Sequence, residues 1–226
     1  MKMLIVLDVD GTLYDLNDVV AANYEMQVEF LAEQTGKPRQ EIVEYLEANC
    51  VFPVMCEKSR SATELFARDG FSAKDWNAFR EGRFPVDEID ISKAATSSDV
   101  AAFREFGWVV LLSSNSYVTI SHILERLAVP VDVFDAVVCS DRYSRPTPFV
   151  KIDAMADLLA RFGVSGESLL SIGDRFNTDI GPALELGGSG VLVRGALSLS
   201  AVARDLAHGA LSTGNEYEFF ERRSTE

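Results

Sequence analysis

Residues 3–12 read MLIVLDVDGT, an apolar run that ends in two aspartates, Asp8 and Asp10, and a glycine. A short apolar run bounded by turn-forming residues is typical of a strand that is buried on both faces. Open α/β sheets bind their ligands at the carboxyl ends of the strands, and a spacing of two puts both carboxylates on one side of an extended chain. The stretch therefore predicts a central strand that carries two acids to a ligand-binding edge. An ordinary Asp-Gly turn is the plainer interpretation of the same residues.

Four more apolar runs follow along the chain, at residues 108–112, 136–139, 169–172 and 190–193. Apolar residues at three- and four-residue spacing predict helices between and after them, over residues 116–127, 148–162, 178–186 and 198–207. Alternating strands and helices predict right-handed crossovers and a parallel sheet with helices on both faces. We therefore expect an α/β fold, a doubly wound, Rossmann-like parallel sheet.

The stretch from residue 15 to residue 95 has a different pattern, without a convincing strand. Helical spacing of apolar residues predicts helices over residues 19–34, 39–49, 59–68 and 72–79, with a linker at residues 85–90. We expect two domains. The α/β core would comprise residues 1–14 and 96–226, and an all-helical cap of residues 15–95 would be inserted after the first strand.

Composition and charge exclude several classes of protein. The chain has 226 residues, with 21 Lys and Arg against 35 Asp and Glu, so its net charge of −14 argues against nucleic-acid binding. The three cysteines, Cys50, Cys56 and Cys139, form no CxxC pair, so neither a disulfide framework nor a zinc site is predicted. The first apolar run is too short for a signal or a membrane span. We expect a cytoplasmic protein with no membrane partner, and the oligomeric state stays open.

Two further strand ends carry polar residues. The run of residues 109–116 reads VVLLSSNS, so Ser114 and Asn115 stand where a helix begins, as an ordinary N-cap or as an anion site. The run of residues 169–179 reads LLSIGDRFNTD and ends in Asp174 and Asp179. Acids at neighbouring strand ends repel one another and need a cation, and Mg²⁺ is the expected choice for an all-oxygen site.

Taken together and in order, these residues resemble motifs one, two and four of the haloacid dehalogenase-like hydrolase superfamily. The motifs are DVDGTL from Asp8, the strand that ends at Ser114-Asn115, and Gly173-Asp174 with Asp179 five positions further on. The resemblance covers nearly the whole chain, and a helical insert directly after motif one resembles the small helical cap of that superfamily.

The resemblance implies roles for the acids. Asp8 would be the nucleophile that forms an aspartyl-phosphate, and Asp10 the acid/base that protonates the leaving oxygen and activates water. Asp8, the main-chain carbonyl of Asp10 and Asp174 would hold Mg²⁺.

The resemblance also implies supporting roles around these acids. Ser114 and Asn115 would hold the phosphoryl oxygens or the nucleophile. Asp179 would support the water shell of the metal or the basic residue. Thr12 would support the same site without binding the metal or the phosphate directly.

The third motif departs from the pattern of the superfamily. A lysine usually comes directly before a Pro-x-Pro turn, but Arg145 has that place here, followed by Pro-Thr-Pro. Lys151 lies three positions beyond the second proline, and counting back from Gly163 brings it toward the usual position. We favour Lys151 as the phosphate-binding cation, with Arg145 as the alternative because it can clamp a phosphate with two hydrogen bonds.

The function that fits best is hydrolysis of a small phosphorylated metabolite, a sugar phosphate or a nucleoside monophosphate, by a Mg²⁺-dependent phosphatase. A dehalogenase would need no metal and would leave the acid cluster unexplained. A phosphosugar mutase of the same superfamily uses the same residues, and a non-catalytic module that accepts a phosphoryl group is the alternative outside enzymes. In the predicted cap, Lys58, Arg60 and Arg68 can reach a substrate, although plain surface charge is the simpler interpretation.

Overall fold

The computed structural model describes residues 2–49, 62–143, 149–214 and 216–221, and these form a six-stranded sheet. The strands are β1 (Met3–Leu7), β2 (Gly107–Ser113), β3 (Ala136–Cys139), β4 (Leu169–Gly173), β5 (Ser189–Val193) and β6 (Tyr217–Glu221). Their order is β3-β2-β1-β4-β5-β6, with all neighbours parallel except β5 and β6. The predicted α/β fold with a doubly wound parallel sheet is confirmed.

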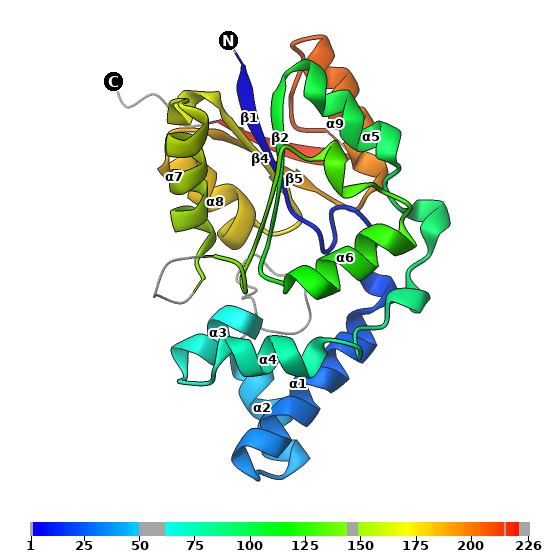
Figure 1. Cartoon of the computed structure of the whole chain (residues 1–226), viewed down its shortest axis with the longest axis vertical. Helices are drawn as coiled ribbons and strands as arrows, with labels where there is room; N and C mark the ends of the chain where they lie inside the picture. Colours follow the sequence, from blue (N-terminus) through cyan, green and yellow to red (C-terminus); the bar gives the residue numbers. More distant parts are fainter. Residues whose placement is uncertain (1, 50–61, 144–148, 215, 222–226) are drawn as a thin grey trace.

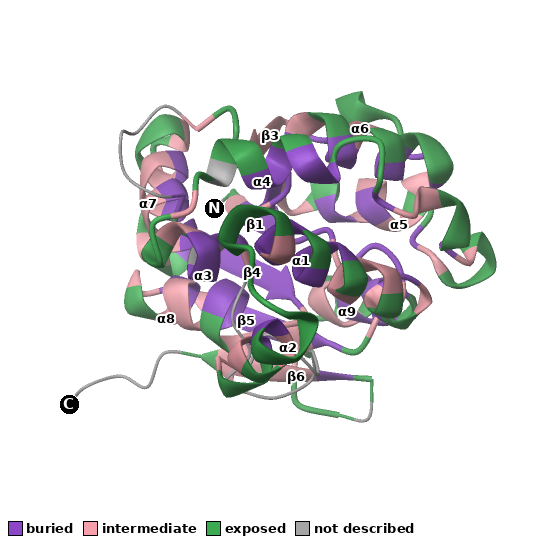
Figure 2. Ribbon diagram, turned by 90° about the horizontal axis from the view of Figure 1, so that it is seen from below, coloured by how far each residue is buried: buried purple, intermediate pink, exposed green. Residues whose placement is uncertain are grey.

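Helices cover both faces of the sheet (Figure 1). On one face lie α7 (Lys151–Phe162) and α8 (Gly181–Glu185), and on the other α5 (Ser97–Ala102), α6 (Tyr117–Arg126) and α9 (Leu197–Ala207). Side chains alternate along β1, so that Leu4 and Val6 pack with Met155 of α7, whereas Ile5 and Leu7 join the core on the opposite face. Strands buried on both faces explain why β1 is apolar throughout (Figure 2).

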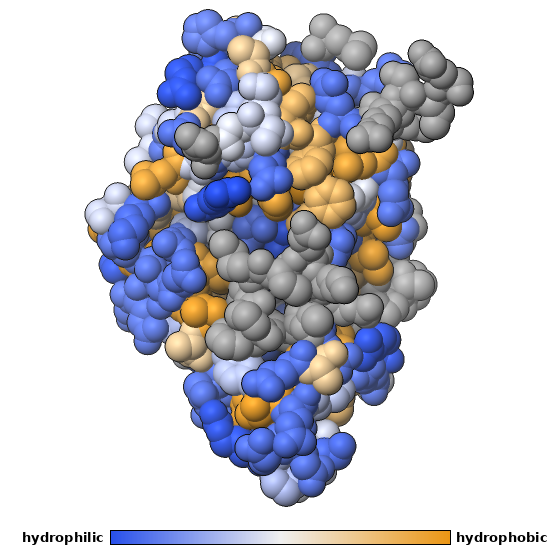
Figure 3. Space-filling model, turned by 180° about the vertical axis from the view of Figure 1, so that it is seen from behind, coloured by the Kyte–Doolittle hydropathy of each residue, from blue (hydrophilic) through white to orange (hydrophobic). Residues whose placement is uncertain are grey.

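Of the α-helices described between β1 and β2, the first four lie below the carboxyl ends of the strands in space (Figure 1). They are α1 (Val20–Thr35), α2 (Arg39–Ala48), α3 (Ala62–Arg68) and α4 (Ala73–Arg80), and we call them the inserted helices. Their core is aromatic, because the ring of Phe30 lies 5.3 Å from that of Phe66 and 5.1 Å from that of Trp76. Their outer surface is mostly hydrophilic (Figure 3).

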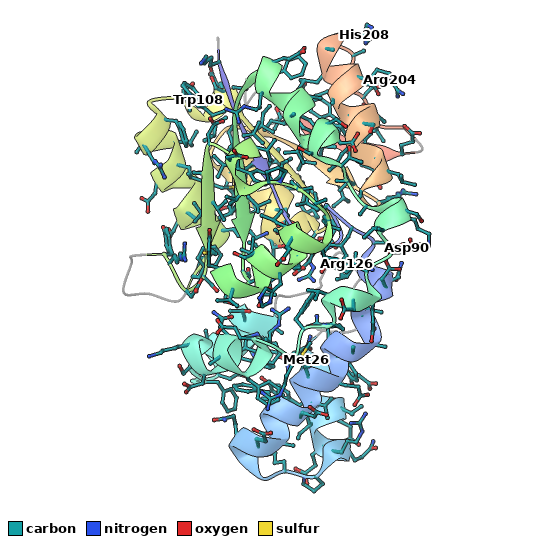
Figure 4. All side chains as sticks on the ribbon, turned by 45° about the vertical axis from the view of Figure 1, so that its right-hand side comes forward. Met26, Asp90, Trp108, Arg126, Arg204 and His208 are labelled. Atoms are coloured by element: carbon teal, nitrogen blue, oxygen red, sulfur yellow. The ribbon has the colours of Figure 1, made fainter. Side chains whose placement is uncertain are left out.

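The chain segment that leaves the sheet for the inserted helices lies beside the segment that returns from them. The carboxylate of Asp18, on the outgoing chain, accepts a hydrogen bond from the backbone N–H of Asp90, on the returning chain (2.9 Å). Arg126 of α6 donates to the carbonyl oxygen of Ile89 (3.1 Å), and Figure 4 shows it between α6 and the returning segment. These contacts set the direction in which the inserted helices leave the sheet.

Some elements differ from the sequence-based expectation. Strand β6, which ends at Glu221, was not predicted. The helix expected over residues 178–186 consists of a π-helix, Phe176–Ile180, followed by α8. The wider π turn lets the carboxylate of Asp179 accept a hydrogen bond from the backbone N–H of Arg175 (3.0 Å).

The remaining expectations concern cysteines and the membrane. Cys139 is a buried free thiol, whereas Cys50 and Cys56 lie outside the described residues. Among the helices that the structure describes, none combines the length and the apolar character that crossing a bilayer requires.

Candidate active site

A tight turn after β1 brings the first acids to the sheet edge. The backbone N–H of Asp8 donates to the carbonyl oxygen of Ile172 in β4 (3.0 Å), and the chain then turns at Gly11, whose φ is +72°. A Cβ atom on Gly11 would stand 2.3 Å from the Oδ2 atom of Asp174. Only glycine therefore allows this turn to pack against Asp174.

Three buried acids meet at this edge. Asp8, Asp174 and Asp179 each offer one carboxylate oxygen, and these oxygens lie within 4.8 Å of one another. Burial, with the charges of Asp179 and Asp10, raises the pKa of Asp8 to about 7, although Lys151 opposes the shift. Burial also raises the pKa of Asp174 to about 8. The Oδ1 atom of Asp174 is buried without a hydrogen-bond partner, so this cluster can bind a metal ion.

Lys151 supplies a positive charge to this cluster. It is the first residue of α7 and is 5% exposed, and its Nζ atom lies 2.7 Å from Asp8 and 2.6 Å from Asp179. Burial disfavours the charged amine, but the two carboxylates outweigh that effect and raise the pKa of Lys151 above its usual value. The ammonium therefore stays charged beside the carboxylate of Asp8.

Asp10 has different partners from the three clustered acids. One of its oxygens accepts from the hydroxyl of Tyr14 (2.5 Å), and the other accepts from the side-chain amide of Asn115 (2.9 Å). Burial and the charge of Asp10 raise the pKa of Tyr14, so the phenol keeps its proton. Asp8 and Asp10 lie on the same turn but in different environments. Sites in which two carboxyl groups take different acid and base roles require such a difference.

Asn115 connects the sheet edge to the inserted helices. Its side-chain oxygen accepts a hydrogen bond from the guanidinium of Arg80, at the end of α4, while its amide holds Asp10. A second contact runs through Ser140, whose hydroxyl accepts from the amide of Asn77 (2.9 Å) and donates to the backbone oxygen of Asn115 (3.1 Å). The inserted helices therefore dock directly on the edge that carries the acids.

A polar pocket lies between these two parts of the molecule. Five of its lining residues were predicted from the sequence, namely Asp8, Asp10, Ser114, Asn115 and Lys151. Asp174 and Asp179 lie beside them in the acid cluster. The hydroxyl of Thr12 is buried without a hydrogen-bond partner, and Arg145 lies outside the described residues.

Other sequence-based expectations concern residues away from the sheet edge. Arg68 is exposed and pairs with Asp69, whereas Lys58 and Arg60 lie outside the described residues. Sequence reasoning missed Tyr14, which holds Asp10. It also missed Arg80, Arg175, and Asn23 and Gln27 of α1, which line the pocket. Asn23 and Gln27 are one helical turn apart, and this spacing could have indicated that they share a face of α1.

Comparisons with known proteins agree with this architecture. A family model described as haloacid dehalogenase-like hydrolase matches residues 2–187. No curated protein matches the chain. Similar solved structures include a HAD phosphatase from Thermococcus onnurineus, with a TM-score of 0.54 and 16% identity over 85% of this chain and 86% of that one.

Two further solved structures show the same fold. CbbY from Rhodobacter sphaeroides, in complex with phosphate, has a TM-score of 0.54 and 18% identity over 86% of this chain and 87% of that one. A 2-haloacid dehalogenase from Pseudomonas syringae pv. Tomato DC3000 has a TM-score of 0.51 and 16% identity over 93% of this chain and all (100%) of that one. The solved structures with this fold thus include a protein named as a phosphatase and one named as a dehalogenase.

The acid cluster predicts a pH-dependent loss of stability in the metal-free protein. The folded-state pKa values of Asp8 and Asp174, about 7 and about 8, lie above the ordinary 3.8, so their contribution to stability is complete below that ordinary value and is lost as pH rises through the folded-state values. Between about pH 4 and pH 8, melting temperatures in EDTA should therefore fall more steeply in wild type than in Asp174→Asn, whose amide cannot ionise, and above that range the two slopes should converge. MgCl₂ should raise the wild-type melting temperature more at high pH. Equal slopes in the two proteins at every pH would contradict this origin.

The turn at Gly11 predicts a selective loss of metal affinity. In Gly11→Ala the new methyl group would displace the carboxylate of Asp174, whereas Gly36, with φ +66°, has nothing within 4 Å of its Cβ position. Both alanine variants should lose about 1–2 kcal/mol of unfolding free energy from backbone strain. Only Gly11→Ala should also bind Mg²⁺ at least about tenfold more weakly by calorimetry, since it alone moves a ligand. Equal metal affinity in the two variants would contradict the close packing of the turn on Asp174.

Proposed function

The chain belongs to the haloacid dehalogenase-like hydrolase family, and from that premise we propose that it is a Mg²⁺-dependent phosphatase of the cytoplasm. Its substrate would be a small phosphorylated metabolite, a sugar phosphate or a nucleoside monophosphate. The observation that carries the proposal is the pairing of Asp8 with Lys151 and two further acids, while a second carboxyl group, Asp10, is held apart. In this proposal residues 15–95 form a helical cap over a core of residues 1–14 and 96–226.

The residues present fit a divalent cation. Asp8 and Asp174, with the main-chain carbonyl of Asp10, would hold Mg²⁺, and Asp179 would support the same site. The Oδ1 atom of Asp174 accepts no hydrogen bond, and its ion-pair partner, the Nε atom of Arg175, is 3.9 Å away. Burial raises the pKa values of Asp8 and Asp174, and a bound cation would stabilise both acids in their charged form. When bound, the cation neutralises these acids and withdraws charge from the oxygens of the phosphoryl group.

Asp8 begins the proposed reaction. A carboxylate oxygen of Asp8 attacks the phosphorus atom, and the bond between phosphorus and the ester oxygen breaks. The leaving oxygen takes a proton from Asp10, which must be protonated at that moment, and an aspartyl-phosphate remains on Asp8. Lys151 holds one oxygen of Asp8 and offers positive charge to the transferred group, which Ser114 and Asn115 contact.

Asp10 returns to act in the second half of the reaction. It takes a proton from a water molecule, whose oxygen attacks the phosphorus atom of the aspartyl-phosphate. The bond between Asp8 and phosphorus breaks, so that inorganic phosphate leaves and the carboxylate of Asp8 is restored. Tyr14 and Asn115, one on each oxygen, orient Asp10 for both proton transfers.

Phosphoryl transfer explains more of the site than dehalogenation does. A reaction at a carbon atom needs no metal, and it would leave the gathering of three carboxylates at one sheet edge unexplained. A phosphosugar mutase would use the same residues, so the reaction product decides between the two: inorganic phosphate from a phosphatase, a rearranged sugar phosphate from a mutase.

The first test is release of phosphate from an aryl phosphate and from a panel of metabolite phosphates. We expect wild type to release phosphate with MgCl₂ and to lose that activity in EDTA. Asp8→Asn should reduce turnover by at least about 10⁴-fold, since subtilisin lost as much or more without its nucleophile. A folded wild-type protein that releases no phosphate from any ester, or an Asp8→Asn variant of near-normal activity, would contradict the proposal.

The role of Asp10 is tested separately. An aryl leaving group needs little protonation, so Asp10→Asn should still transfer the phosphoryl group to Asp8 but should hydrolyse the aspartyl-phosphate about 10²–10⁴-fold more slowly. Rapid-quench kinetics should show a burst of the released phenol, and intact-mass spectra should show one added phosphoryl group. Unchanged steady-state kinetics would remove Asp10 from the acid/base role.

A further inference from the structure

Arg80 is a buried cation that forms no direct ion pair with an acidic side chain among the described residues. Burial lowers its pKa, and the charge of Asp10, which lies beyond Asn115, offsets only part of that shift. It is 5% exposed, and its guanidinium donates to the neutral side chain of Asn115 and lies over the rings of Trp76 (5.3 Å) and Phe84 (5.0 Å). Its Nε atom has no hydrogen-bond partner. A buried charge is costly unless it is paired, and aromatic faces offset only part of that cost. The guanidinium therefore has unused capacity to bind an anion.

Two amide side chains of α1 line the same pocket with unused acceptors. The Oε1 atom of Gln27 and the Oδ1 atom of Asn23 are buried without a hydrogen-bond partner. Gln27 is only 6% exposed, and the two residues are one helical turn apart, so they share a face of α1. Buried carbonyl oxygens of this kind are suited to accept hydrogen bonds from hydroxyl groups.

These three residues come from the inserted helices, whereas the groups proposed to act on the phosphoryl group come from the sheet edge, and Arg80 reaches that second set through its hydrogen bond to Asn115. Lys151 is already paired with Asp8 and Asp179, and it comes from the sheet side of the pocket. Arg80, Gln27 and Asn23 come from the inserted helices α4 and α1, on the other side. A substrate with its phosphoryl group at Asp8 would therefore turn its remaining atoms toward them.

Resting on the proposed phosphatase function, we infer that Arg80, Gln27 and Asn23 form a subsite for the distal part of the substrate. The preferred substrate is a polyhydroxylated phosphate ester with a second acidic group, a carboxylate or a second phosphate. Arg80 binds the acidic group, and the oxygens of Gln27 and Asn23 accept from the hydroxyl groups. Nucleoside monophosphates lack the second acid, so the subsite favours phosphorylated sugar acids and sugar bisphosphates over them.

The substrate test uses pairs of esters that differ in the second acid: phosphoglycerate against glycerol phosphate, and a hexose bisphosphate against the hexose monophosphate. Wild type should prefer the acidic member of at least one pair by about tenfold or more in kcat/KM, and the preferred pair distinguishes a carboxylate from a phosphate. A hydrogen bond to a charged group is worth about 1.5–3 kcal/mol, so Arg80→Gln should lower kcat/KM for that ester by about 10- to 100-fold, mainly through KM.

Matched variants separate recognition from a structural role of Arg80. Arg83 is exposed, lies three residues further along the chain and does not line the pocket, so Arg83→Gln removes the same charge and should leave the preference intact. Arg80→Lys keeps the positive charge and should recover part of the preference for acidic esters. If Arg80 acted only through its contact with Asn115, the lysine variant would not recover that preference. Gln27→Leu should weaken the binding of hydroxylated esters more than the binding of an aryl phosphate. Equal losses for acidic and neutral esters in Arg80→Gln would overturn the subsite.

Binding to the inert Asp8→Asn protein separates this inference from the proposed reaction. Calorimetry with the same esters should show tighter binding of the acidic member, and Arg80→Gln in that background should abolish the difference. If wild type hydrolyses no ester but this difference in binding is found, the subsite stands and the phosphatase proposal fails. If phosphate is released without any preference for a second acid, the phosphatase proposal stands and the subsite fails.

Discussion

The burial of three carboxylates around one lysine is the constraint on which the rest of the site depends. Asp8, Asp174 and Asp179 come from the ends of two adjacent parallel strands, and Lys151 alone of the described cations contacts two of them. Arg175 adds a second positive charge, 3.9 Å from Asp174, but two positive charges still face three acids. This imbalance adds to the burial that raises the pKa values of Asp8 and Asp174. A divalent cation would remove it, so the same constraint that strains the metal-free site favours metal binding.

Two local departures from regular backbone keep the cluster together. The left-handed turn at Gly11 lets the chain after β1 pass against Asp174, and a side chain on Gly173 would meet Asp179 at 2.5 Å. The π turn after β4 returns the carboxylate of Asp179 to the backbone N–H of Arg175. Each departure is unfavourable by itself, and the packing of the sheet edge maintains it. Such irregularities concentrate where a fold carries a site rather than a plain core.

The sequence predicted those parts of the site whose signals are local. A buried strand that ends in acids is visible in the order of the residues, so Asp8, Asp10 and Asp174 were identified, and counting along one helix favoured Lys151. Arg80 has no such signal, because an arginine in the last turn of an amphipathic helix is ordinarily a solvated residue. Its burial depends on how α4 docks on Asn115, a contact between residues 35 positions apart. Strand β6 was missed for a similar reason, since it pairs antiparallel at the edge of an otherwise parallel sheet.

The three described cations that line the pocket, Lys151, Arg175 and Arg80, differ in their partners, and this difference bears on how an acidic protein admits an acidic substrate. With a net charge of −14, the molecule as a whole repels anions, so attraction must come from inside the pocket. Lys151 is already paired with Asp8 and Asp179, and Arg175 lies 3.9 Å from Asp174. Arg80 forms no ion pair among the described residues and contacts the neutral oxygen of Asn115 instead. Because Arg80 belongs to the inserted helices and Asn115 to the sheet, an anion bound there would lie where the two parts meet. Its binding would then favour the docked arrangement that also holds Asp10 in place.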